Sequence, residues 1–366
     1  MKREQNSRSP PHDRLKPIRY LLRLVTTPAS SRVLPPLSTC PDPLRRGVPI
    51  RFQEKFFPLG TVVQVESNDE AVIRASRRSF GLYGAPPAAS DPEILIQICV
   101  DPDRHDDRPL PVPTYRSLRH IFHIACSDTN FAVADLASGC AVGFVSPEMV
   151  GNASFFCYTF LECLFYVMVV HRSHTPVHCS SVALNGSGIL ICGAAGAGKT
   201  TLAYACAKSG MQILTDDVAH LRLDPTSDRL LLWGNPWCLR LLPDAVQLFP
   251  ELADEKVTQR RDHDWYLEID TLRRFPGRTL ASCRPAGLVF LVRQEGVPTR
   301  LSPMRREIAL ERLREDITLD EDAIIERHYS VLDQLVGTGT YTLKYSGAPS
   351  AAVEVIKSLL HKELRR

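Results

Sequence analysis

The sequence predicts an α/β domain over residues 171–366, preceded by a smaller α+β domain over residues 51–170 and a disordered N-terminal tail over residues 1–50. The chain has 366 residues, of which 44% are apolar and 23% are charged, and this is enough for two hydrophobic cores. After residue 171 the pattern changes from strands with few helices to strand, turn, strand, glycine-rich loop, helix and strand. Before residue 50 no hydrophobic period is sustained. These two changes of pattern set the expected domain boundaries.

The first 50 residues are rich in proline and in positive charge. They hold nine of the 28 prolines and ten Lys and Arg residues against three acidic residues. Such a segment buries too little apolar surface to offset the entropy cost of ordering, so we expect a disordered tail, either a basic arm or the product of an early start codon. The whole chain has a net charge of +3, so the remainder is mildly acidic. This balance argues against nucleic acid as a partner.

One stretch is apolar enough to raise the question of a membrane. Residues 155–170 read FFCYTFLECLFYVMVV, which is shorter than the ~20 residues that a span needs and has Glu162 at its centre. We therefore expect a buried core helix, or a subunit interface, and no membrane segment. The start of the chain lacks the apolar run of a secretion signal, and the eleven cysteines form no CxxC pair. These features predict a cytoplasmic protein with reduced thiols and leave a homo-oligomer open.

The first domain is expected to be a mixed or antiparallel sheet with few helices. Ser67 and Glu70 match a capping box that would open a helix over residues 71–76. We find no catalytic constellation here, and we interpret His120 and His123 as structural. Strands are expected at residues 60–65, 93–100, 121–125, 131–134 and 141–145.

A phosphate-binding loop is the strongest motif in the chain. Residues 193–200 read GAAGAGKT, between a strand at residues 187–192 and a helix that continues from residue 201. The glycines allow backbone N–H groups to approach phosphates, Lys199 reaches the β and γ phosphates, and the Thr200 hydroxyl ligates Mg²⁺. The motif predicts a site for ATP and Mg²⁺, against a degenerate or structural loop. The nucleotide-binding residues would be Gly193, Ala194, Ala195, Gly196, Ala197, Gly198, Lys199, Thr200 and Thr201.

Two adjacent acids follow the next strand along the chain. Asp216 and Asp217 stand at the C-terminal end of a strand over residues 211–215, and one helix separates them from the phosphate loop. Because open α/β sheets present ligands at this edge, one carboxylate, here Asp217, could hold Mg²⁺ while the other accepts a proton from an attacking hydroxyl. The alternative is that the acids cap a turn.

A hairpin places a histidine near the same loop. Asn185-Gly186 is a two-residue hairpin signal between strands at residues 177–184 and 187–192. In that register His178 lies opposite Gly193, the first residue of the loop. A bulge at the start of the second strand would shift this pairing by one residue. We therefore predict a functional role for His178 beside the phosphates.

Residues 177–221, VHCSSVALNGSGILICGAAGAGKTTLAYACAKSGMQILTDDVAHL, resemble the catalytic domain of the HPr kinase/phosphorylase family. The phosphate site of that family resembles in turn that of phosphoenolpyruvate carboxykinase. The resemblance implies a P-loop kinase domain of this type and ATP-dependent phosphorylation of a serine hydroxyl, with one Asp of the pair as base, the other near Mg²⁺, and His178 beside the reaction centre. Two residues depart from the family loop, because Ala195 replaces a Ser and Thr201 replaces a Glu.

Outside the resembling segment, one further cation is a candidate. Arg240 could stabilise charge on the transferring phosphoryl group, against a solvated or salt-bridged Arg, and His220 and Arg222 have weaker claims. The strand at residues 287–292 ends without an acid, which favours a kinase over a mechanical ATPase. The predicted function is an ATP-dependent kinase acting on a hydroxyl of a protein or peptide. The alternatives are a small-molecule hydroxyl kinase and a nucleotide-binding regulator without turnover.

Overall fold

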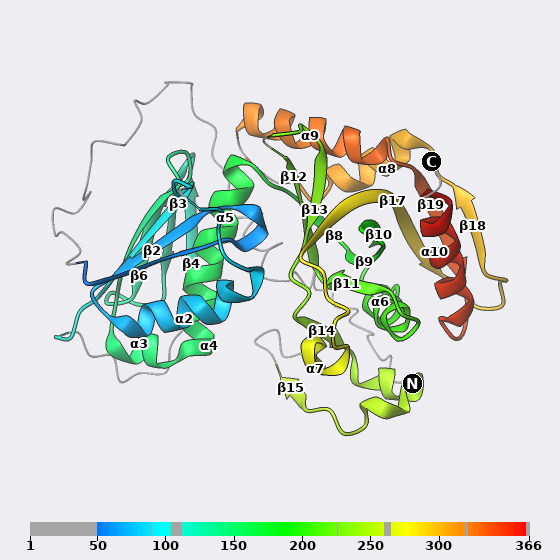
Figure 1. The fold of residues 1–366 in the computed structure, drawn as a ribbon, viewed down its shortest axis with the longest axis horizontal. Helices are drawn as coiled ribbons and strands as arrows, with labels where there is room; N and C mark the ends of the chain where they lie inside the picture. Colours follow the sequence, from blue (N-terminus) through cyan, green and yellow to red (C-terminus); the bar gives the residue numbers. More distant parts are fainter. Residues whose placement is uncertain are drawn as a thin grey trace, which may run out of the picture.

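The computed structural model describes residues 50–363, apart from residues 89, 104–111, 225, 260–264, 318 and 320. The predicted tail over residues 1–50 lies outside this part of the chain, except for its last residue. The described residues form two lobes, one built on a seven-stranded sheet and the other on a nine-stranded sheet (Figure 1). The two sheets share no strand among these residues. The last helix of the first lobe ends at Arg172, and the first strand of the second sheet begins at Thr175.

The first sheet has the strand order β1-β2-β3-β7-β6-β5-β4. Strands β2, β3 and β7 are parallel to one another, and the other pairs are antiparallel. Every strand predicted in this region is present, but β1 and β4 were not expected. Both are edge strands with mostly exposed residues, so they lack the apolar alternation that sequence patterns detect. The strands are β1 (Phe52–Phe56), β2 (Val63–Ser67), β3 (Ile94–Val100), β4 (Thr114–Leu118), β5 (Ile121–Ala125), β6 (Phe131–Asp135) and β7 (Cys140–Val145).

The predicted capping box at the start of α2 (Glu70–Phe80) is wrong in detail. The cap is Asp69, whose carboxylate accepts a hydrogen bond from the N–H of Ala71 at 2.8 Å. Ser67 ends β2 and is fully buried, and its hydroxyl donates to the carbonyl of Ile98 in the neighbouring strand. Because that hydroxyl is held by the sheet, the next residue with a short polar side chain and free geometry caps the helix.

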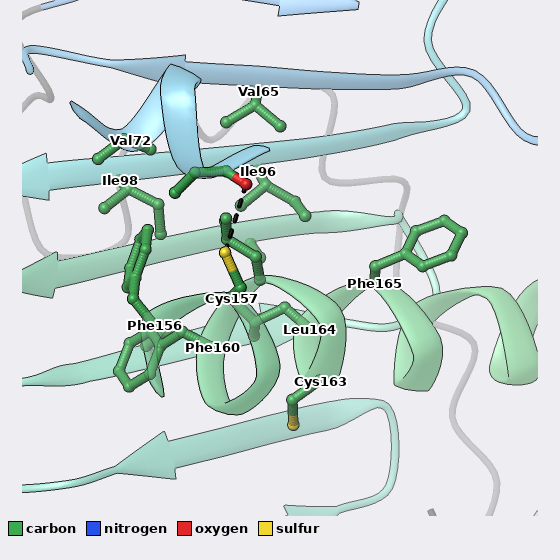
Figure 2. Packing of buried hydrophobic residues seen from close by; sticks show 14 of the residues in the cluster. Val65, Val72, Ile96, Ile98, Phe156, Cys157, Phe160, Cys163, Leu164 and Phe165 are labelled. Carbon is green, nitrogen blue, oxygen red and sulfur yellow. Dashed lines mark hydrogen bonds between the residues drawn. The ribbon is translucent and has the colours of Figure 1, made fainter. Parts of the chain in front are cut away.

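A long helix and α2 together cover one face of this sheet. The long helix comprises α4 (Ala153–Phe156), a π-helical turn (Cys157–Leu161) and α5 (Glu162–Arg172), and it follows the short α3 (Pro147–Gly151). The helix is long and apolar enough to cross a membrane by length and composition, but 67% of its most apolar window is buried inside the protein. Figure 2 shows it lying along the sheet, with Phe156, Phe160 and Leu164 in one cluster with Ile96 and Ile98. The prediction of a buried core helix is confirmed.

Helices cover both faces of the second sheet. Along β10 (Ser187–Cys192), Ile189 and Ile191 pack in a cluster with α6 (Lys199–Lys208) and α10 (Ser350–Glu363), whereas Leu190 and Cys192 pack with α8 (Arg306–Arg314) and α9 (Asp322–Val336). Such a strand reads as a continuous apolar run. Figure 1 shows α9 and α8 along one side of this sheet and α6 and α10 on the other.

The strand order of this sheet is β11-β9-β10-β17-β13-β12-β8, and β19 pairs with both β17 and β18. Strands β10, β17 and β19 are parallel. The last strand, β19, is followed by the C-terminal helix α10. The strands are β8 (Thr175–His178), β9 (Ser180–Leu184), β10, β11 (Gln212–Thr215), β12 (Val218–Leu223), β13 (Leu230–Trp233), β17 (Ser282–Arg293), β18 (Arg300–Pro303) and β19 (Thr340–Tyr345).

The predicted strand over residues 177–184 is two strands, divided at Cys179. Strands β9 and β10 form the expected hairpin in the expected register, with Ser180 opposite Ile191. The preceding strand β8 instead pairs with β12, where His178 lies opposite Val218. The chain changes partner because the N–H of Cys179 donates to the carbonyl of Asp217 at 3.1 Å. The prediction that His178 continues the hairpin opposite Gly193 is therefore wrong.

A small third sheet, of order β14-β16-β15, lies beyond α6 at the lower edge of the second lobe (Figure 1). Its buried residues, such as Leu239 and Ile269, join the cluster around α6. Its elements are β14 (Cys238–Leu241), two 3-10 turns (Pro243–Gln247 and Pro250–Leu252), β15 (Val257–Gln259), β16 (Trp265–Asp270) and α7 (Thr271–Arg274).

Most of the cysteines lie in the protein interior. Seven of the ten cysteines among the described residues are buried. These seven pack as small apolar residues of the cores.

Candidate functional site

The phosphate loop joins the end of β10 to the start of α6, as the motif predicts. Gly193 and Gly198 have φ angles of 152° and 90°, and a Cβ at Gly193 would lie 2.9 Å from the carbonyl oxygen of Leu291. A Cβ at Gly198 would fall on the hydroxyl of Tyr345. Both positions therefore need glycine for conformation and for space. Gly198 is also the N-cap of α6 and offers no side chain, so no side-chain cap covers the first N–H groups of that helix.

Lys199 lies over the loop that precedes it. Its Nζ donates to the carbonyl oxygens of Gly193 at 2.8 Å and Ala194 at 3.2 Å, and the residue is 8% exposed. On the other side of the loop, Tyr345 Oη donates to the carbonyl of Ala197 at 3.1 Å. Burial raises the pKa of Tyr345, which keeps it a hydrogen-bond donor. Tyr345 was missed because only tertiary packing brings the end of β19 to the loop.

A cavity of about 620 Å³ opens in front of the loop. This volume is within the range of about 300–1,000 Å³ typical of small-molecule sites. Sequence reasoning predicted the loop and His178 as parts of one site, but it missed the wall formed by the ends of β17 and α8. The lining residues are His178, Cys192, Gly193, Ala194, Ala195, Gly196, Ala197, Phe290, Leu291, Val292, Arg293, Arg312, Leu313, Glu315 and Asp316.

The two predicted acids lie at the same edge of the sheet as the loop. Strand β11 runs antiparallel to β9, and β9 runs antiparallel to β10, so the ends of β11 and β10 point the same way. Asp216 is 4% exposed, and its carboxylate accepts hydrogen bonds from the N–H of Arg240 at 2.9 Å and from Ser180 Oγ at 3.4 Å. Two donors therefore hold Asp216 in place. Asp217 is half-buried and faces His178.

His178 connects Asp217 to the cavity. Its Nδ1 lies 2.9 Å from the carbonyl oxygen of Asp217 and 3.3 Å from the carboxylate Oδ1 of the same residue. Both oxygens are acceptors, so Nδ1 carries a proton, and the neutral imidazole has its lone pair on Nε2. The predicted pairing of His178 opposite Gly193 is wrong, but the His178 ring still lines the cavity. It does so because β8 pairs with β12, and this pairing brings His178 to the site.

Arg240 lies next to the acids but does not line the cavity. Its Nε is 3.5 Å from a carboxylate oxygen of Glu268, so the ion pair considered as the alternative is present. Burial by itself lowers the pKa of Arg240. The electrostatic interactions with Cys238, Asp216 and Asp217 raise it by more, so the pKa lies above its ordinary value. Arg240 therefore supplies a fixed positive charge beside the Asp pair, and its backbone N–H orients Asp216.

Two residues with weaker claims, His220 and Arg222, link the lobes and do not line the cavity. The His220 ring stacks on Tyr166 of the first lobe, with centroids 5.3 Å apart, and burial lowers its pKa to about 3. Arg222 Nη2 donates to a carboxylate oxygen of Glu93 at 2.8 Å, and Nη1 donates to the carbonyl of Gly60. Both side chains therefore hold the two lobes together.

The predicted Mg²⁺ donors fit a metal that is held largely by phosphate oxygens and water. Thr200 is in the first turn of α6, and Asp217 follows β11 at the same sheet edge, so the protein would supply hard oxygen ligands. Across the described ranges, no group of three or more His, Cys, Asp or Glu side chains forms a metal cage.

Comparisons with known proteins give little further information. No protein-family model matches the chain, and no curated protein matches it. Among solved structures, the HPr(Ser) kinase/phosphatase from Coxiella burnetii is similar over 52% of this chain and 90% of its own, with 14% sequence identity and a TM-score of 0.28. A likeness of this size carries no information about the activity of this chain.

Proposed function

We propose that this protein is an ATP-dependent kinase that transfers the γ-phosphate to a hydroxyl, such as that of Ser, in a protein or peptide. The observation that carries the proposal is one shared cavity. Its floor is a phosphate loop with two glycines at φ angles that other residues rarely adopt, and its side holds a histidine oriented by the second residue of the Asp pair.

The phosphate loop binds the triphosphate of ATP. The backbone N–H groups of residues 193–198 and the uncapped first turn of α6 donate to phosphate oxygens, and Lys199 moves its hydrogen bonds from the loop carbonyls to the phosphates. Thr200 and Asp217 would hold Mg²⁺, which neutralises charge on the β and γ phosphates when it is bound.

Asp217 and His178 act on the proton of the acceptor. The acceptor hydroxyl oxygen forms a bond to the γ-phosphorus, the bond from phosphorus to the ADP oxygen breaks, and ADP leaves with that electron pair. The hydroxyl proton passes to Nε2 of His178, while Asp217, which would also hold Mg²⁺, accepts the hydrogen bond from His178 Nδ1 and orients the ring. The carboxylate of Asp216 accepts hydrogen bonds from two donors, so we assign it a positioning role for Asp217 and Arg240.

The acceptor is proposed to be a macromolecule because the loop is open. Residues Ala194, Ala195 and Gly196 are exposed, so a peptide segment can approach the γ-phosphate without entering the core. A small-molecule hydroxyl and binding without turnover are the competing functions, and the acceptor assay separates them.

The test follows labelled γ-phosphate from ATP into water, peptides and metabolites, with ATP affinity measured by calorimetry. Lys199→Ala should lower ATP affinity by about 10- to 100-fold, the scale of lost hydrogen bonds to a charged group. Lys208→Ala is the matched control, since Lys208 ends the same helix and pairs with Glu251 on the surface. Equal ATP affinity in wild type and Lys199→Ala would refute the phosphate site. Tight binding without transfer to any acceptor would refute the kinase and support a regulator.

A further inference from the structure

Part of the cavity wall lies outside the phosphate loop and carries different side chains. It is formed by the end of α8, with Arg312, Leu313, Glu315 and Asp316, and by the last residues of β17. The Arg312 guanidinium lies 5.5 Å from the ring centroid of Phe290, a cation–π distance. The wall therefore combines a planar cation, apolar surface and two carboxylates.

Charge decides which part of a nucleotide can face this wall. The carboxylates of Glu315 and Asp316 repel phosphate oxygens, so the triphosphate belongs at the other end, where N–H groups and Lys199 converge. Carboxylates instead accept hydrogen bonds from hydroxyl groups, and they contact ribose in this way in other nucleotide sites. The wall is thus complementary to an uncharged group that carries hydroxyl donors.

We propose that the end of α8 binds the nucleoside of the nucleotide, with Glu315 and Asp316 accepting the ribose hydroxyls and Arg312 stacking on the base. This inference rests on the proposed function, because it takes the phosphate loop as the triphosphate site. A planar guanidinium offers its face to a planar base, and the adjoining Leu313 and Phe290 supply apolar surface. Arg312 and the two acids then decide that the site takes a nucleotide and not a bare polyphosphate.

The experiment measures affinity for ATP, 2′-deoxy-ATP and inorganic tripolyphosphate by calorimetry. Arg312→Ala should weaken ATP about 10-fold, the scale of losing a stacking partner, and change tripolyphosphate by less than about 2-fold. Arg314→Ala is the matched control. Arg314 is on the same helix, lies 4.4 Å from the ring centroid of Tyr329 and does not line the cavity. It should leave both affinities within about 2-fold.

The ribose contact is tested separately. Wild-type protein should bind ATP about 10-fold more tightly than 2′-deoxy-ATP, because a hydrogen bond to a charged group is lost. The double variant Glu315→Ala, Asp316→Ala should narrow this ratio to about 3-fold or less, while Glu311→Gln, an exposed acid one turn earlier, should keep it.

Each outcome distinguishes the two proposals. If wild-type protein binds ATP and tripolyphosphate equally and Arg312→Ala weakens both alike, the nucleoside assignment is overturned while the phosphate site stands. If wild-type protein binds neither compound, the proposed function itself is refuted, and the nucleoside assignment with it. Thermal unfolding of each variant checks that the fold is intact.

Discussion

The two lobes differ in how helices cover their sheets and in where their polar side chains lie. In the first lobe helices cover one face of the sheet, and buried polar residues serve the fold: Asn130, for example, accepts a hydrogen bond from the N–H of Ser146 at 2.8 Å. In the second lobe helices cover both faces, and polar side chains gather at the edge where β10 and β11 end. The comparison indicates that the first lobe is a packing unit and that the chemistry belongs to a sheet edge of the second.

The largest expected effect is on the stability of the first lobe. Phe160 is fully buried in its core helix, so Phe160→Ala should lower the free energy of unfolding by about 3–5 kcal/mol through lost apolar contact and a residual cavity. Denaturant unfolding followed by circular dichroism measures this change. Tyr158→Phe in the same helix, at a residue that is 51% exposed, is a mild control.

If the first lobe only supports the second, ATP affinity of Phe160→Ala should stay near that of wild type at low temperature, where the variant is folded. A large loss of ATP affinity in folded protein would show that the first lobe contributes to the site.

The next effect concerns the edge of the second sheet and should appear mainly in activity. Asp217→Asn should lower phosphoryl transfer by at least about 100-fold, the usual scale for losing a positioned base or metal ligand, with little change in melting temperature. His178→Asn places a donor near the Nδ1 position but lacks Nε2, and it should also slow transfer. Asp216→Asn should lower transfer as well and cost stability, because its carboxylate accepts two hydrogen bonds. Full transfer in both Asp variants would exclude the proposed mechanism.

Acid should destabilise the contact between the lobes. Burial lowers the pKa of His220 to about 3, whereas an unfolded histidine has a pKa near 6.5. Below about pH 6.5 the unfolded chain binds a proton that folded His220 does not, so this stability is complete above pH 6.5 and is lost as the pH falls. Between pH 6.5 and 5 the loss from this residue is about 2 kcal/mol.

The matched variant is His220→Phe, which keeps a ring to stack on Tyr166 and removes the titration. The free energy of unfolding should fall between pH 6.5 and pH 5 in both proteins. The fall should be about 2 kcal/mol smaller in the variant than in wild type. An identical pH dependence in the two proteins would show that His220 is not neutral and buried between the lobes.

The smallest effect tests the helix cap of the first lobe. Asp69→Ala should cost about 1 kcal/mol, because the carboxylate that satisfies the N–H of Ala71 is lost. Glu70→Gln should change stability by less than about 0.5 kcal/mol, since its pair with Arg74 is exposed. Thermal unfolding compares the two, and a larger loss from Glu70→Gln would restore the capping box that the sequence predicted.

The elements of the fold that were predictable share a local signal. The core helix, the hairpin at Asn185-Gly186 and the strand before the phosphate loop each carry an apolar period or a turn residue that acts over a few positions. Edge strands β1 and β4 carry no such signal, because their residues are mostly exposed. The break at Cys179 was also unpredictable, since strands on both sides of it are apolar and only the partner strand differs.

The sequence by itself determined the phosphate loop, the two acids and the register of the hairpin, because each depends on residues close together in the chain. Only the tertiary structure decided what surrounds them. The pairing of β8 with β12 directs His178 to the cavity, the end of β19 places Tyr345 against the loop, and the end of α8 brings Arg312 to the cavity wall. The first contact joins residues 39 apart, and the other two join segments more than 100 residues apart, so none of them leaves a local pattern in the sequence.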